Sequence, residues 1–142
     1  MTGSENIYQK IRLYDHNHKI ILANTSDIDV SRLVYSTYTM QVIDDEEGIS
    51  IVSSRPYYSI EKIPAHSYLE LEALDPYEDG VLFYVFEKVM WADGSVDDNI
   101  RNIRIVSLSN YTMTFGSPFT DMKRIDRDKT YIKSDAGYEY RL

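Results

Sequence analysis

Short runs of β-branched and aromatic residues, each closed by turn-forming residues, most constrain what this chain can fold into. They recur at intervals of roughly 8 to 12 residues from Ile11 to Tyr140, and no stretch keeps a helical period over three turns. This pattern is typical of a β-sandwich or a small barrel. We therefore expect an all-β chain that forms a single immunoglobulin-like β-sandwich of seven or more strands over residues 1–142. Residues 109–142 would form a C-terminal strand extension.

Three local patterns carry this expectation. Polar residues at His16-Asn17-His18 predict a hairpin turn between two short strands. Pro56 and Pro64 bracket a segment that we expect at a sheet edge or in a long connection, because proline cannot donate to a ladder. Ser67–Leu74 alternates, which predicts one buried and one wet face. The buried face would carry Leu69, Leu71 and Ala73, and the wet face Tyr68, Glu70 and Glu72.

The run Val81–Trp91 is apolar at nearly every position, so we expect a central strand that is covered on both sides. Strict alternation separates it into two apolar faces, of which a sandwich core takes one. The other face would be covered by the C-terminal segment or by a second chain. One face would hold Val81, Phe83, Val85 and Val89, and the other Leu82, Tyr84, Phe86 and Met90.

Part of the chain resembles a known kind of module. Ile63-Pro-Ala-His-Ser67, the strand Val81–Met90 and Trp91-Ala-Asp-Gly-Ser95 are similar to the second half of bacterial immunoglobulin-like modules of the FxLYD type. Ile11-Arg-Leu-Tyr-Asp15 resembles the string that names the type, but here it precedes the turn Asn24-Thr-Ser26, whereas in those modules it follows that turn. The resemblance spans about a third of the chain. It implies a fold and an accessory role, and it carries over no catalytic residue.

The formal charge of −8 is unevenly distributed along the chain. Asp44–Asp98 contains fourteen acidic residues against three basic ones, whereas residues 99–142 contain eight basic and five acidic residues. A chain with this balance repels phosphate backbones, so we do not expect direct binding to nucleic acid.

Two groups of residues are candidates for binding a protein. If successive strands alternate in direction, every second loop lies at the same end, which would gather several acidic turns on one rim. Such a rim would dock a basic partner, and the alternative is that these turns are merely soluble. Tyr57 and Tyr58 are candidates for stacking on a partner or on a sugar ring, since the chain has thirteen tyrosines, more than one core needs. The acidic candidates are Asp44, Asp45, Glu46, Glu47, Asp75, Glu78 and Asp79.

The residues offer little catalytic or metal chemistry. Asp15, His16 and His18 are of ligand type for zinc or copper, but ordinary turn chemistry explains them equally well. Asp93–Asn99 resembles part of a calcium loop without its terminal glutamate. His66-Ser67 has no nucleophile-elbow context. We therefore predict that the chain is not an enzyme and needs no cofactor or metal.

These observations favour a non-enzymatic protein-interaction or structural accessory module. Its partner would be another protein or a second copy, and the frequent isoleucine suggests a low-GC bacterium or its phage. No cysteine and no membrane-spanning apolar run are visible, so we expect a cytoplasmic protein without membrane contact. Two alternatives stay open. One is an acidic inhibitor that occupies a basic surface of a host factor, and the other is a carbohydrate-binding module that uses exposed tyrosines and Trp91.

Overall fold

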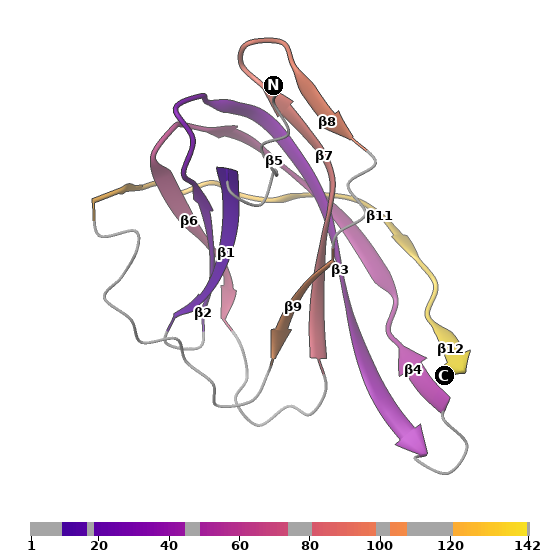
Figure 1. The fold of residues 1–142 in the computed structure, drawn as a ribbon. Helices are drawn as coiled ribbons and strands as arrows, with labels where there is room; N and C mark the ends of the chain where they lie inside the picture. Colours follow the sequence, from indigo (N-terminus) through magenta and orange to yellow (C-terminus); the bar gives the residue numbers. More distant parts are fainter. Residues whose placement is uncertain are drawn as a thin grey trace, which may run out of the picture.

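The computed structural model shows a chain that is nearly all β, arranged in two sheets (Figure 1). It describes residues 10–16, 19–44, 49–73, 81–98, 103–107 and 121–141. Within these ranges no helix is long and apolar enough to cross a membrane. The strands are β1 (Ile11–His16), β2 (Lys19–Asn24), β3 (Val30–Asp44), β4 (Ile49–Val52), β5 (Arg55–Ile63), β6 (Ser67–Ala73), β7 (Val81–Trp91), β8 (Val96–Asp98), β9 (Ile103–Ser107), β10 (Lys123–Arg124), β11 (Thr130–Asp135) and β12 (Tyr138–Arg141).

The smaller sheet has the strand order β1-β2-β6-β10. β1 and β2 form the antiparallel hairpin that the sequence predicts, with Leu13 opposite Leu22. β6 continues the sheet antiparallel to β2, and the two residues of β10 pair with β6 in parallel. The β-rich runs on either side of the polar turn therefore confirm the predicted hairpin.

β3 is the central strand of the larger sheet, and it has fifteen residues. One side of β3 pairs with β7 along most of its length, while the other pairs with β5 through its first half and with β4 through its second half. β11 lies beyond β5, β12 beyond β4, and both β8 and β9 lie beyond β7. In Figure 1 the hairpin of β3 and β4 extends past the smaller sheet, with β12 beside it. The expected strand at 110–119 lies outside the described residues.

The segment between Pro56 and Pro64 is not an edge or a connection, as the sequence predicted, but the strand β5. It pairs with β3 on one side and with β11 on the other. Pro56 is the second residue of β5 and Pro64 follows its last residue. Pro56 is opposite Ser134 near the start of β5 and Pro64 lies beyond its end, so the residues between the two prolines keep their donors.

A single buried cluster joins the two sheets. Leu69 is part of it, as expected, but Leu71 is only partly buried and Ala73 is exposed, so β6 leaves the core toward its end. The smaller sheet contributes Ile11, Ile20, Leu22 and Leu69, and the larger sheet Val30, Leu33, Tyr35, Ile60, Ile63, Leu82, Tyr84, Phe86, Val89 and Trp91.

Two bulges change which residues of β7 and β6 face this core. In β7, Val34 pairs with Lys88 and Tyr35 with Phe86, so Glu87 is an extra residue that shifts the alternation by one position. β7 is an interior strand, as the sequence predicts, with β3 on one side and β8 and β9 on the other. Because of the bulge, Val89 lies on the core side and not with Phe83 and Val85.

The bulge in β6 corrects a second predicted face. Ile20 pairs with Glu72 and Ile21 with Glu70, so Leu71 is the extra residue. Glu72, expected on the wet face, accepts a hydrogen bond from the buried hydroxyl of Tyr84.

At one end of the molecule the chain passes from one sheet to the other, and we call these connections crossings. The side chain of Asn24 joins two of them by hydrogen bonds. This side chain is buried, with 1% of the residue exposed. The amide nitrogen donates to the carbonyl of Ile28 at 2.9 Å and to those of Ile63 and Pro64 at 3.2 Å. The amide oxygen accepts from the backbone and the hydroxyl of Ser26. The link from β2 to β3 is therefore bonded to the link from β5 to β6.

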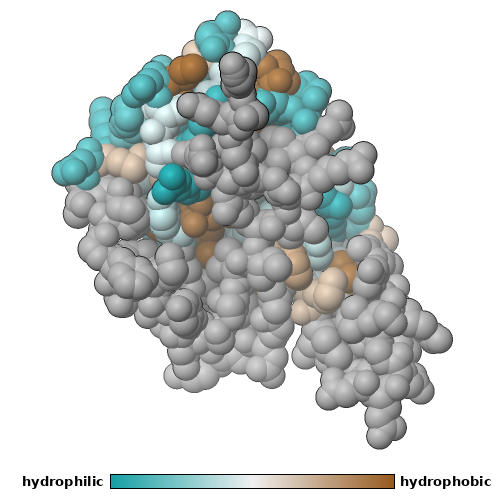
Figure 2. Space-filling model, in the orientation of Figure 1, coloured by the Kyte–Doolittle hydropathy of each residue, from teal (hydrophilic) through white to brown (hydrophobic). Residues whose placement is uncertain are grey.

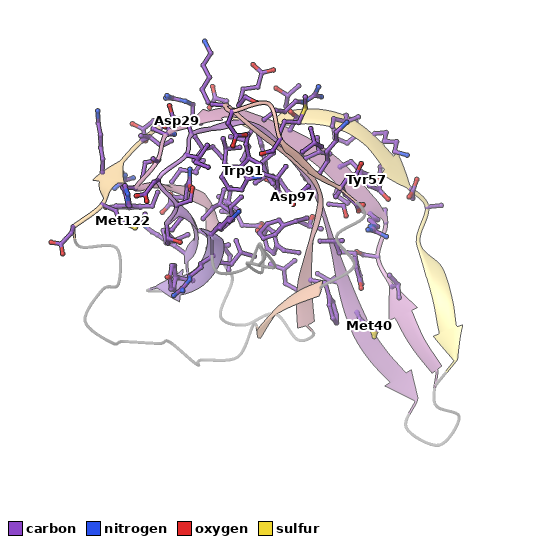
Figure 3. The ribbon with its side chains drawn as sticks, turned by 45° about the horizontal axis from the view of Figure 1, so that its top comes forward. Asp29, Met40, Tyr57, Trp91, Asp97 and Met122 are labelled. Carbon is purple, nitrogen blue, oxygen red and sulfur yellow. The ribbon has the colours of Figure 1, made fainter. Side chains whose placement is uncertain are left out.

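Asp29 extends this junction to β7. Its carboxylate accepts from the backbone nitrogen of Ala65 at 2.8 Å, and its backbone carbonyl accepts from Ala92 at 2.9 Å. Figure 3 shows Asp29 and Trp91 at the same end of the molecule. Three segments that are distant in sequence are thus held by hydrogen bonds at this end.

We predict that Asn24→Ala lowers the free energy of unfolding by about 1 to 3 kcal/mol, because it leaves buried carbonyls without a donor. Urea denaturation followed by circular dichroism measures the change. Asn24→Asp is the matched variant, since it keeps the acceptor for Ser26 but loses the donor, and it should be at least as destabilising. Midpoints equal to that of the original chain would show that the junction contributes nothing.

The bulge in β7 predicts that substitutions at two neighbouring residues differ in their cost to stability. Val89→Ala should cost about 2 kcal/mol because Val89 is fully buried, whereas Met90→Ala, at a half-buried position on the opposite side, should cost clearly less. Urea midpoints of the two variants measure this difference. The reverse order would mean that β7 keeps strict alternation and has no bulge at Glu87.

Candidate interaction surface

Four tyrosine rings form a row across adjacent strands of the larger sheet. Tyr84 of β7, Tyr35 of β3, Tyr58 of β5 and Tyr131 of β11 follow one another, with ring centroids 5.8, 5.6 and 6.1 Å apart. Tyr35 is opposite Tyr58 in the register, and Tyr58 is opposite Tyr131. These distances are those of favourable aromatic pairs. We call Tyr84, Tyr35, Tyr58 and Tyr131 the tyrosine row.

The tyrosine row runs from the interior to the surface. Tyr84 and Tyr35 are buried, Tyr58 is half-buried, and Tyr131 is 59% exposed. The ammonium of Lys129 lies 4.3 Å from the centroid of the Tyr58 ring, a distance suited to a cation–π contact. The outer end of the row is therefore aromatic and positively charged.

The inner end of the tyrosine row has a different electrostatic character. Burial raises the pKa of Tyr84 and of Tyr35 well above the ordinary tyrosine value, and the negative charge of Glu72 adds to the effect on both. The hydrogen bond that the Tyr84 hydroxyl donates to Glu72 raises the pKa of Tyr84 further. Both side chains are thus neutral phenols at physiological pH.

β11 is an edge strand whose six residues are all exposed. Among the described strands it pairs only with β5, so the side of Thr130–Asp135 away from β5 has no partner; we call this side the β11 edge. Ile132 is the bulged residue in the pairing and is 42% exposed. Tyr131, Ile132 and Val96 are the large hydrophobic residues that the described part of the chain exposes.

Tyr57 lies on the other face of the sheet from Tyr58, beside β11 (Figure 3). Its hydroxyl donates a hydrogen bond to Asp135 at 3.0 Å. The pKa of Tyr57 is raised mainly by burial, and this hydrogen bond is the second cause. The Arg55 guanidinium and the Lys133 ammonium lie 5.3 and 4.7 Å from its ring centroid. Tyr57 and Tyr58 therefore do not form one patch. They lie beside β11 on opposite faces of the sheet, and each ring already has a cationic side chain over it.

The acidic residues predicted to dock a partner are mostly beyond what the structure describes. Asp44 is the last residue of β3. The backbones of Asp15 and His16 belong to β1. The residues outside the described ranges are Asp45, Glu46, Glu47, Asp75, Glu78, Asp79 and His18.

His66 and Ser67 do not form a catalytic arrangement. Ser67 is buried and donates its hydroxyl to the carbonyl of Pro64 at 2.5 Å. The His66 ring nitrogen Nε2 instead lies 2.7 Å from the exposed carboxylate of Asp27. The serine hydroxyl is thus directed away from its neighbouring histidine.

In the turn that resembles part of a calcium loop, the carboxylates of Asp93 and Asp97 accept hydrogen bonds from residues of the same hairpin. Asp93 accepts from the backbone and the hydroxyl of Ser95, and these bonds lower the pKa of Asp93. Asp97 accepts from the Trp91 indole at 2.7 Å. Within the described ranges no three His, Asp or Glu side chains are grouped so as to hold a metal ion.

The end that carries the crossings is largely hydrophilic. Figure 2 shows polar residues over much of the described surface at the top of the molecule, interrupted by separate hydrophobic residues rather than by a continuous apolar patch.

Sequence reasoning missed Lys129, Tyr131 and Ile132 as site residues. The run Thr130–Lys133 indicates a strand, but only its pairing with the distant β5 makes it an edge.

We predict that the buried tyrosines stay protonated in the folded protein at pH values where exposed tyrosines ionise. A raised folded-state pKa contributes stability below the unfolded-state value of about 10, and this contribution is lost as the pH rises above that value. Phenolate absorbance and circular dichroism, followed together, should show late ionisation that coincides with unfolding. Glu72→Gln should bring the ionisation of Tyr84 to lower pH, while Glu70→Gln on the exposed face should not. Complete ionisation near pH 10 in a folded chain would contradict this assignment.

The comparisons with known proteins add no relative. No protein-family model, no curated protein and no solved structure matches this chain. The functional argument therefore depends on the tyrosine row, the β11 edge and the charges around them.

Proposed function

We propose that this protein is a non-enzymatic protein-interaction module that binds an extended segment of a partner along the β11 edge. The observation that carries the proposal is that β11 pairs only with β5 among the described strands, is exposed at every residue, and bears Tyr131 and Ile132. An edge strand presents a row of unpaired N–H and C=O groups, which an extended peptide can use to join the sheet. Exposed apolar side chains on the same strand add contact area.

The tyrosine row supports this role from behind the edge. Tyr131 packs edge-on against Tyr58, which packs against the buried Tyr35. A site that is already ordered loses less conformational entropy when it binds, and tyrosine is enriched at protein interfaces. The bulge at Ile132 and the flanking lysines are features that limit indiscriminate edge pairing. Together they favour a selective contact over aggregation.

We further propose that the two sheets form an immunoglobulin-like sandwich. The order β1-β2-β6 corresponds to strands A, B and E of that fold, and β9-β7-β3-β5 corresponds to G, F, C and C′. β10 occupies the position of strand D but runs parallel to β6, where an antiparallel strand is expected. Such folds carry many functions, so this assignment supports an accessory module only by analogy.

The proposal predicts that extended peptides selected for binding protect the β11 backbone. Peptides would be selected from a random display library on the full chain, and hydrogen–deuterium exchange would then locate the protected amides. We expect protection at Thr130–Asp135. Tyr131→Ser combined with Ile132→Ser should weaken binding about tenfold, which corresponds to about 1.4 kcal/mol.

Val96→Ser is the matched control, because Val96 is exposed to a similar extent but lies on β8. It should leave the affinity unchanged. Selected peptides that protect β8 or the crossing end, and that bind the double variant as tightly as the original chain, would overturn the proposal.

A further inference from the structure

The segment around β11 is locally positive in an acidic protein. Residues 123–133 contain five cationic side chains and two acidic ones, although the whole chain has a formal charge of −8. The acidic residues Asp126 and Asp128 are exposed and lie between the cations in sequence. The cationic residues are Lys123, Arg124, Arg127, Lys129 and Lys133.

None of these five cations makes an ion pair within the part of the chain that the structure describes. The ion pairs found there join Lys19 to Glu70, Arg55 to Glu87 and His66 to Asp27. Arg127 instead donates to the backbone carbonyls of Lys62 and Asp126. Within the described residues, no carboxylate therefore forms an ion pair with the positive charges of residues 123–133.

Lys129 and Lys133 place this charge on both faces of the edge. The Lys129 ammonium lies over the ring of Tyr58, and the Lys133 ammonium lies over the ring of Tyr57. Because Tyr57 and Tyr58 are consecutive residues of β5, their rings point to opposite faces of the sheet. A strand that joins the sheet at β11 would thus have an ammonium group near it on each face.

We infer that the segment bound along the β11 edge is an acidic polypeptide strand, with carboxylates on both of its faces. This inference rests on the proposed function and specifies its partner. Carboxylates opposite Lys129 and Lys133 complement charges that form no ion pair within the described residues, and charge complementarity governs specificity and the rate of encounter. A basic strand is repelled at the same edge.

A polypeptide fits this site better than a nucleic acid does. The edge offers backbone donors and acceptors in strand geometry, which a peptide matches along its length. A nucleic acid brings a dense line of phosphates toward a chain whose overall charge is strongly negative.

The test uses three short synthetic peptides that differ only at alternate positions. Valine alternates with glutamate in the first, with glutamine in the second and with lysine in the third. Calorimetry on the full chain measures affinity at low and high salt, and hydrogen–deuterium exchange reports protection of Thr130–Asp135. We expect the glutamate peptide to bind at least about tenfold more tightly than the glutamine peptide at low salt, with a smaller ratio at high salt. The lysine peptide should not protect β11.

A pair of charge variants assigns the preference to this edge. Lys129→Gln with Lys133→Gln should abolish the preference for glutamate over glutamine. Lys19→Gln with Lys88→Gln removes the same charge from exposed positions on β2 and β7, so it should retain most of that preference. Equal loss in both variants would mean that net charge, and not the β11 edge, selects the peptide, which would overturn the inference.

The remaining outcomes separate the two proposals. If the glutamine peptide protects β11 as well as the glutamate peptide does, the edge binds strands but the acidic preference is wrong. If no peptide protects β11, the proposed function fails together with the inference. Stronger protection of β11 by a single-stranded oligonucleotide would also overturn the acidic strand as the partner.

Discussion

The arrangement of the two sheets depends on the hydrogen bonds of the Asn24 side chain. It lies where β2 leaves the smaller sheet, and it bonds to Ile28 in its own crossing and to Ile63 and Pro64 in another. A buried amide with these partners tolerates little displacement, because each lost bond leaves a polar group unsatisfied. The positions of β3 and β5 relative to β2 are therefore set at one end. Since β3 and β5 supply Tyr35 and Tyr58, the junction also orients the middle of the tyrosine row.

Two bulges also determine which side chains of β7 and β6 face the core. A strand that alternates strictly along its length presents one fixed set of side chains, whereas the extra residue Glu87 lets β7 present Tyr84 and Val89 to the same core. The extra residue Leu71 likewise turns Glu72 toward Tyr84, where its carboxylate accepts a hydrogen bond from the phenolic hydroxyl. The inner end of the tyrosine row therefore depends on two local departures from regular pairing. Each inserts one residue and reverses the faces beyond it.

The sequence predicts the strands better than it predicts their faces or their neighbours. β-branched runs locate β1, β2, β3 and β7 because strand propensity and turn residues are local properties. The bulges at Leu71 and Glu87 follow from pairing with distant strands, so alternation alone misplaces Glu72 and Val89. The candidate site was missed for the same reason, since β11 becomes an edge only through its pairing with β5. The sequence offers Tyr57 and Tyr58 for stacking on a partner or a sugar ring, and as consecutive strand residues their side chains lie on opposite faces of the sheet.

Gly137 explains why the β11 edge ends where it does. A Cβ atom at this position would lie 2.6 Å from the backbone carbonyl oxygen of Val52, so only glycine allows the two backbones to approach there. The break between β11 and β12 thus fits beside the break between β4 and β5. The β11 edge therefore extends from Thr130 only as far as Asp135. For the proposed strand partner, the length of the edge and the two lysines that flank it would together select a short extended segment by its charge.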